Sequence, residues 1–358
     1  KENFINDYAL GDYVNIVGEL KVPNNNTVFN LFNYNKYLYY NKIFYTINIE
    51  CIELNAKNKN ILFTIKNNII KRISNIKLSN KYLYAFILGE NSYIDSNIKD
   101  SFQINGISHL FAISGMHISL ITLILLKILD KFKYKYLAIF LFLIFYMFLT
   151  SFSHSILRAG IFFIILSLNK IFKLNFNTIN LLLITLIICL ILNPFIIYSV
   201  GFQFSFIISM YLILLNKLIS KYKSKISSLF IVSLISFLSS MPIVITNFFQ
   251  INILSILLNI IFVPYVSIIL FPFSLITFIF PFLDNILYIL IQILEYTSVM
   301  CSKIKFLILI YSDINTIFII IYYIFITIFL YGLLNNNKYY NIPLILILII
   351  HYNINYFN

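Results

Sequence analysis

The sequence is poor in charged residues, which make up 11% of its 358 residues against 60% in the hydrophobic set, and its mean hydropathy is +0.89. Soluble globular proteins carry about a quarter charged residues and under half apolar ones. A soluble enzyme with a polar shell is therefore excluded for most of the length. Because polar residues concentrate before about residue 105, we expect an α-helical integral membrane protein with a polar N-terminal module.

Cysteine is also scarce, and its three copies, Cys51, Cys189 and Cys301, lie far apart in the sequence. No Cys-x-x-Cys pair and no His/Cys cluster occurs in the sequence. Neither a zinc site nor a disulfide framework is therefore predicted. We expect no metal and no cofactor.

Acidic residues are outnumbered two to one, with 13 against 26 basic residues, which gives a formal net charge of +13. Only Arg72 and Arg158 are arginine; the other basic residues are lysine. This charge suits a polyanionic partner or anionic lipid. The simpler interpretation is that most of the lysines orient the membrane spans.

The first 65 residues alternate in the manner of short strands separated by glycine and proline turns. Three strands are predicted, at Tyr13–Leu20, Ile43–Leu54 and Ile61–Ile65. They favour a small β-rich module of the OB type over residues 1–65, followed by an amphipathic helical connector over residues 66–105 and a transmembrane domain over residues 106–358. The polar start at Lys1 contains no signal peptide, so we expect further spans upstream of it.

From residue 106 onward the chain is a series of apolar blocks, and a span needs about 20 apolar residues. About eight spans are predicted, within a range of seven to ten, near residues 109–129, 136–151, 155–172, 178–198, 200–219, 226–247, 255–280 and 314–334. Leu283–Met300 carries Asp284, Gln292 and Glu295, which fits an interfacial helix better than a span. Ile342–Ile350 is too short to cross the membrane alone.

Lysines gather in alternate loops of this predicted membrane domain. The loops after the first, third and fifth spans hold Lys127, Lys131, Lys133, Lys135, Lys170, Lys173, Lys217, Lys221, Lys223 and Lys225. Basic loops are cytoplasmic by the positive-inside rule. The N-terminal module is therefore expected outside the cell.

The entry to the first span holds two His, three Ser and two Gly within residues 106–119. Its candidate functional residues are Ser108, His109, Ser114, Gly115 and His117. On an unbroken helix His109 and His117 lie about 80° apart, so both can line one cavity. The alternative is that they make hydrogen bonds between packed helices.

Arg158 is the arginine of the membrane domain, about one turn inside the third predicted span. At a helix centre in lipid its charge costs roughly 2.5–3.5 kcal/mol. Either the side chain snorkels to the outer interface, or it faces a hydrated interior with anionic partners.

Three prolines, Pro194, Pro242 and Pro264, are candidate helix breaks because each removes a backbone donor and frees a carbonyl at membrane depth. Such breaks are tolerated where they line a cavity or are buried in protein. The alternative for each is an ordinary kink. Their recurrence near amides, among them Gln203 and Asn259, favours a polar path.

The segment Ser108-His-Leu-Phe-Ala-Ile-Ser-Gly-Met-His-Ile118 resembles the signature of the ComEC competence proteins, membrane channels that take up transforming DNA. The resemblance continues, in the family's order, through Leu88-Gly-Glu, Ser155-Ile-Leu-Arg-Ala159, Asn193-Pro, Gly201-Phe-Gln-Phe-Ser205, Pro242, Asn259 and Pro264. It covers roughly residues 80–270.

This resemblance implies an inner-membrane channel that conducts single-stranded DNA through the bacterial cytoplasmic membrane during natural transformation. The implied partners are single-stranded DNA, the lipid bilayer, a DNA receptor, a cytoplasmic helicase or translocase, and a separate nuclease. Arg158, His109 and His117 would meet phosphates, and Phe and Tyr side chains would meet bases. Many family members end in a metallo-β-lactamase-like domain with a His-x-His-x-Asp-His cluster, which this sequence lacks, so we expect no nuclease activity from it.

Three other functions remain open at this point. An intramembrane hydrolase would use Ser114 with His109 or His117, but it also needs an orienting group and an oxyanion hole. A small-solute secondary transporter would show an inverted repeat, which the sequence does not display. A non-conducting remnant of the channel family is the third alternative.

Overall fold

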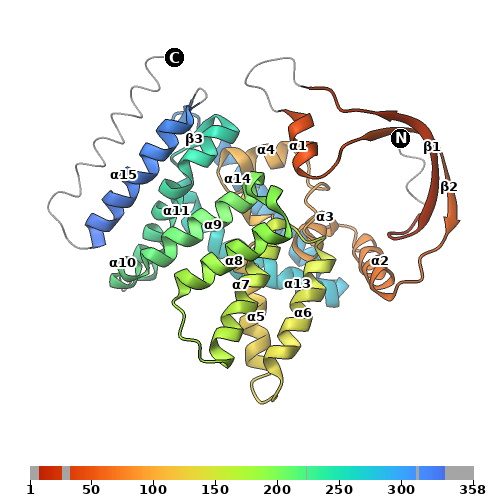
Figure 1. The fold of residues 1–358 in the computed structure, drawn as a ribbon, viewed down its shortest axis with the longest axis horizontal. Helices are drawn as coiled ribbons and strands as arrows, with labels where there is room; N and C mark the ends of the chain where they lie inside the picture. Colours follow the sequence, from red (N-terminus) through yellow and green to blue (C-terminus); the bar gives the residue numbers. More distant parts are fainter. Residues whose placement is uncertain (1–7, 26–32, 223, 312–313, 335–358) are drawn as a thin grey trace.

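The computed structural model describes residues 8–25, 33–222, 224–311 and 314–334, and within these ranges the chain is mostly helical (Figure 1). Ile342–Ile350 lies outside the described residues. A curved two-stranded ribbon near the N-terminus stands beside a compact group of helices.

The ribbon consists of β1 (Tyr13–Lys21) and β2 (Thr46–Ala56), which pair antiparallel with Ile16 opposite Ile52. This confirms the first two predicted strands. A short helix, α1 (Tyr34–Tyr40), lies between them. Within the described residues the module contains two strands rather than the closed barrel of an OB fold.

The third predicted strand, Ile61–Ile65, is wrong, because these residues begin helix α2 (Ile61–Ser74). The Asn60 side chain accepts a hydrogen bond from the backbone N–H of Leu62 and caps the helix. The apolar residues continue at helical spacing to Ile73, so a window of five residues could not distinguish the two periods.

The connector is helical, as predicted, and continues through α3 (Asn80–Leu83), the π-helical turn η1 (Tyr84–Leu88) and α4 (Ser96–Ile104). Its middle is not amphipathic, because every residue from Tyr82 to Leu88 is buried. These residues share one hydrophobic core with helices of the membrane domain. The connector is therefore packed into that domain.

The membrane domain contains eleven named helices and several single turns within the residues that the structure describes. The helices are α5 (Gly115–Ile128), α6 (Lys135–Leu149), α7 (His154–Ile171), α8 (Thr178–Leu192), α9 (Val200–Leu214), α10 (Asn216–Lys221), α11 (Lys225–Phe248), α12 (Ser255–Pro264), α13 (Phe271–Ile279), α14 (Asp284–Ser302) and α15 (Thr316–Leu334). The single turns are η2 (Ser108–Leu110), η3 (Pro194–Tyr198), η4 (Tyr265–Leu270) and η5 (Pro281–Leu283), and β3 (Gln250–Asn252) pairs with β4 (Ile308–Ile310).

Six helical ranges among the described residues are long and apolar enough to cross a membrane. They are Ser108–Ile128, His154–Ile171, Lys225–Phe248, Ser255–Ile279, Pro281–Ser302 and Thr316–Leu333. Three further apolar helices, α6, α8 and α9, have 15 residues each. At 1.5 Å per residue they are about 22 Å long, which is shorter than the ~30 Å hydrocarbon core. The eight predicted spans included these three helices and left out Pro281–Ser302.

Polar residues of α14 led to the prediction of an interfacial helix, and the connector binds both of its acidic residues. Asp284 accepts hydrogen bonds from the backbone N–H groups of Leu78 and Ser79, both at 3.0 Å. Glu295 accepts one from the Tyr82 hydroxyl at 2.7 Å. Burial, and then the charge of Glu295, raise the pKa of Tyr82, so that hydroxyl remains a donor. These acids therefore do not require a helix at the membrane surface.

Two of the three lysine-rich segments lie at one end of the helical group. In Figure 1 the α5–α6 turn and the α7–α8 turn occupy the lower side of the view, whereas α10 lies at mid-height and α1 and β3 lie toward the upper side. The orientation expected from the alternate basic loops stays a prediction.

Cysteine labelling tests that orientation. With Cys51, Cys189 and Cys301 replaced, a cysteine at Asn25 should react with an impermeant maleimide in intact cells, and one at Ser224 should react only after permeabilisation. Both positions are exposed in the fold, so a difference in labelling reports the side of the membrane. Labelling at Ser224 in sealed cells would reverse the orientation.

Candidate functional site around Arg158

The chain is broken just before α5, where the sequence places the first group of candidate residues. Gly106 adopts a left-handed backbone with φ of 70°, and a Cβ atom there would lie 2.9 Å from the Cβ of Ser255. Only glycine fits this turn without strain. The short turn η2 follows, and α5 begins only at Gly115. The 80° relation between His109 and His117 is therefore wrong, because no single helix carries both.

His117 is a helix cap with a buried ring. Its Nδ1 accepts a hydrogen bond from the backbone N–H of Ser114 at 3.1 Å and lies 3.2 Å from the Ser114 hydroxyl. The neutral ring then carries its proton on Nε2. That atom is buried without a hydrogen-bond partner among the described residues, and the ring packs 4.4 Å from the ring of Phe271.

Among the described residues, the Ser114–His117 pair has no acidic third member of a hydrolytic triad. Asp130 is the one acidic residue between positions 106 and 260 of the sequence, and it pairs with Lys135 at 3.1 Å. No group of three His, Cys, Asp or Glu that could hold a metal occurs in the described part of the chain. Because no acid orients His117 in the described part of the chain, the geometry is that of a capped helix.

Arg158 lies one turn inside α7 and is only 8% exposed. Its guanidinium carbon is 5.8 Å from the centre of the Phe206 ring, a cation–π contact. Its Nε is buried with no hydrogen-bond partner, and no carboxylate pairs with the guanidinium among the described residues. An unpaired buried charge costs several kcal/mol. Arg158 therefore does not snorkel freely, and its charge lacks a counter-ion within the described structure.

Segments distant in the sequence meet around this arginine. A Cβ atom on Gly115 of α5 would lie 2.6 Å from Nη2 of Arg158, so the absence of a side chain there makes room for the guanidinium. One turn earlier on α7, Ser155 lies beside Gly201 of α9, where an added Cβ would be 3.8 Å from the serine hydroxyl. The signature segments of α5, α7 and α9 are thus parts of one site.

Two pairs of aromatic rings lie between the N-terminal module and Arg158 along η3 and α9. Tyr40 of α1 stacks on Tyr198 of η3, with ring centres 4.0 Å apart and planes 8° apart. Next along the chain, Phe202 and Phe206 of α9 lie 4.6 Å apart, and Phe206 contacts Arg158. Sequence reasoning missed this set. The signal in the sequence was the segment from Tyr34 to Tyr45, which holds six aromatic residues and two lysines without an acid.

Other candidate residues are not joined to Arg158 by hydrogen bonds. Ser108 and His109 are exposed, and Nδ1 of His109 lies 3.2 Å from the carbonyl of Gly106. The Gln203 amide donates to the carbonyl of Ile197 at 2.9 Å and so stabilises η3. Asn259 has a buried Oδ1 without a hydrogen-bond partner in the described structure, as does Asn193 at the end of α8.

The three prolines behave differently from one another. Pro194 is the first residue of η3 and ends α8 as predicted, with Asn193 extended before it. Pro242 lies inside the unbroken helix α11, and the prediction of a break there is wrong. The carbonyl that a proline frees four residues earlier is that of Leu238, and the Tyr322 hydroxyl of α15 donates to it at 2.8 Å. After Pro264 the chain remains helical but widens into the π-helical segment η4.

The fold and the site define a polytopic helical membrane protein with an unpaired arginine buried between its helices. The chain belongs to the Competence protein family, whose family model matches residues 86–335. It is similar to ComE operon protein 3 of Bacillus subtilis, with 29% identity over 72% of this chain and 34% of that protein. It is also similar to Uncharacterized protein MG316 of Mycoplasma genitalium, with 33% identity over 57% of this chain and 52% of that protein.

The aligned regions thus span about a third to a half of the length of these relatives. No solved structure matches the chain. Arg158, Gly115 and the aromatic residues of η3 and α9 all lie inside the range that the family model matches.

Replacing either of two glycines with alanine tests the packing around Arg158. Gly115 and Gly201 both lie in the first turn of a helix, but only the Cβ at position 115 meets the guanidinium. Gly201→Ala should raise the melting temperature of the purified protein slightly, by about 1–3 °C, because it removes freedom from the unfolded chain. Gly115→Ala should melt about 3 °C or more below Gly201→Ala because it displaces Arg158.

An Arg158→Leu background provides the control for this comparison. There the two alanine variants should melt at similar temperatures, because the clashing group is gone. If Gly115→Ala still melts below Gly201→Ala in this background, the added Cβ at position 115 clashes with a group other than the Arg158 guanidinium.

Proposed function

We propose that this chain is the membrane component of a DNA-uptake channel and that it conducts single-stranded DNA into the cytoplasm. The observation that carries the proposal is the buried, unpaired positive charge of Arg158. Family membership and the similarity to ComE operon protein 3 support a role in competence.

A phosphate group would supply the anionic partner that Arg158 lacks among the described residues. Arginine presents several N–H donors in a planar fork that matches phosphate oxygens, and such contacts are stronger where water is excluded. The scarcity of acids in the surrounding helices favours an anion that comes from outside the chain. A DNA strand carries one phosphate per nucleotide, so successive phosphates can occupy the same position during transport.

The aromatic residues near Arg158 are suited to bind the bases of the DNA strand. Bases stack on aromatic side chains regardless of sequence, with about 1–3 kcal/mol per base. Tyr198, Phe202 and Phe206 follow one another from η3 into the first turns of α9. Tyr198 is exposed and Phe206 contacts the guanidinium, so stacking outside and phosphate binding inside would act on one strand.

In the proposed arrangement the N-terminal module faces the outside of the cytoplasmic membrane, and α1 holds it against η3 at the mouth of the path. The partners would be a DNA receptor outside, a helicase or translocase inside, and a nuclease that removes the complementary strand. The lysine-rich turns would lie on the cytoplasmic side, where they also attract anionic lipid.

Substitution of Arg158 tests this function in cells that lack their own copy of the gene. Arg158→Leu should accumulate in the membrane at least as well as the parent protein, because an unpaired charge has been removed. Uptake of labelled DNA into a nuclease-resistant state should fall by about tenfold or more, and DNA binding at the cell surface should persist. Arg158→Lys should retain part of the uptake if a point charge suffices, and little if the planar fork is required.

Lys170→Leu is the matched control, because it removes a positive charge from the exposed end of the same helix. It should leave DNA uptake near the parent level. Normal uptake by Arg158→Leu would contradict the proposal. Failure of that variant to accumulate would also contradict it, because Arg158 would then be a packing element.

A further inference from the structure

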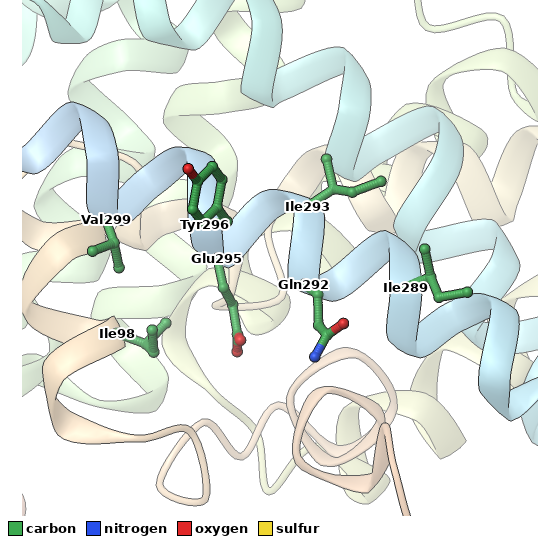
Figure 2. A pocket seen from close by; sticks show the side chains of 7 residues that line it. All are labelled: Ile98, Ile289, Gln292, Ile293, Glu295, Tyr296 and Val299. Carbon is green, nitrogen blue, oxygen red and sulfur yellow. The ribbon is translucent and has the colours of Figure 1, made fainter.

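A hollow beside helix α14 shares no residue with the Arg158 site (Figure 2). Its volume is about 550 Å³, which lies within the range of roughly 300–1,000 Å³ typical of ligand pockets. Apolar side chains form most of its walls, namely Ile289, Ile293 and Val299 of α14 and Ile98 of α4. Two polar side chains of α14, Gln292 and Glu295, point to the same side of the helix and also line the hollow.

The carboxylate of Glu295 has one oxygen engaged and one free. Oε1 accepts a hydrogen bond from the Tyr82 hydroxyl at 2.7 Å, and no cation pairs with this carboxylate among the described residues. The neighbouring lysines of the connector have other partners, because Lys81 pairs with Asp95 at 2.8 Å and Lys99 donates to a backbone carbonyl at 2.8 Å. A partly buried carboxylate without a counter-ion favours a cation that comes from outside the chain.

Gln292 lies one turn before Glu295 and offers the opposite kind of contact. Its side chain is exposed, and its amide has no hydrogen-bond partner in the part of the chain that the structure describes. An amide N–H donates to anionic oxygens, whereas a carboxylate accepts from a cation. Residues three apart on a helix are neighbours, with Cβ atoms about 5–6 Å apart. The pair is thus complementary to a small group that carries a positive charge close to a negative one.

The position of Glu295 along α14 places it near the head groups of a bilayer. The range Pro281–Ser302 is long and apolar enough to cross a membrane, and Lys303 and Lys305 follow it. Glu295 lies seven residues before the end of α14, which is about 10 Å along the helix axis. The adjacent Tyr296 is exposed, and tyrosine is enriched at membrane–water interfaces. A lipid head group can therefore reach Glu295.

We propose that this hollow binds phosphatidylethanolamine, a phospholipid whose head group carries a primary ammonium. The ammonium pairs with the free oxygen of Glu295, and the phosphate accepts from the Gln292 amide. In this lipid the phosphate lies between the ammonium and the acyl chains. Glu295, Gln292 and Ile289 follow one another in the same order from the end of α14 inward, so an acyl chain lies on Ile289.

The carboxylate also makes the hollow selective among lipids. Phosphatidylglycerol has a net negative charge and no cation to pair with Glu295, so the carboxylate disfavours it. The quaternary ammonium of phosphatidylcholine is positive but has no N–H to donate. This inference does not depend on the transport of DNA.

Photolabelling of the purified full chain tests the site. The protein would be placed in phosphatidylcholine nanodiscs that contain a small fraction of phosphatidylethanolamine with a photoreactive acyl chain. Irradiation should label peptides of α14 and α4 about fivefold more than the same probe with a choline or glycerol head group, because only the ethanolamine probe donates charge-assisted hydrogen bonds. Unlabelled phosphatidylethanolamine should compete for the site. Free phosphoethanolamine should not compete, because it has no acyl chain to bury.

Glu295→Gln removes the charge but keeps an oxygen that accepts from the Tyr82 hydroxyl. It should lower labelling by the ethanolamine probe to the level of the choline probe. Gln292→Leu should lower labelling about threefold, because the donor to the phosphate is lost. Asp130→Asn is the matched control, because it removes an exposed carboxylate from the turn between α5 and α6, and it should leave labelling unchanged.

Three outcomes would overturn the proposal. They are equal labelling of α14 by the three head groups, competition by free phosphoethanolamine, and a preference for ethanolamine that survives Glu295→Gln. If Glu295→Gln does not fold, unchanged labelling of Gln292→Leu overturns it instead.

Discussion

A positive charge held inside an apolar group of helices is the constraint on which the membrane domain depends. Arg158 is buried between α5, α7 and α9, and the described residues offer it an aromatic ring but no counter-ion. Transfer of an unpaired charge out of water costs several kcal/mol, so the fold has to offset this cost through the surrounding packing. An anion that enters from outside would remove most of it. In the proposed channel, the charge that is costly to the empty protein would be the group that binds the polyanion.

The position of the Arg158 side chain depends on the space that its neighbours leave for it. Gly115 leaves space for the guanidinium, and the break between Gly106 and α5 sets where α5 begins. The connector packs along α14 through Asp284 and Glu295, and Arg72 donates to the last carbonyls of α13, those of Phe278 and Ile279. These polar groups of the connector and of α14 are thus paired, whereas Arg158 has no carboxylate partner among the described residues.

Features that depend on local composition could be predicted from the sequence, and those that depend on distant contacts could not. Apolar blocks predicted the helices, and Arg158 stood out as a lone arginine among them. The predicted relation of His109 to His117 failed because the turn at Gly106 fits against Ser255, about 150 positions away. The predicted break at Pro242 failed because Tyr322, from another helix, binds the carbonyl that the proline frees. The aromatic segment around Tyr40 is visible in the sequence, but its pairing with Tyr198 depends on a distant contact.

The most direct measurement is contact between DNA in transit and the side chains beside Arg158. A photoreactive benzoylphenylalanine would replace Phe206, or, as a control, Ile191 on the exposed side of α8. The cells would take up DNA whose trailing end carries a bulky group, so that the strand stops during transport. The account predicts that irradiation links the DNA to position 206 and not to position 191, and that Arg158→Leu abolishes the link. DNA that enters normally without linking to position 206, or that links equally to both positions, would contradict it.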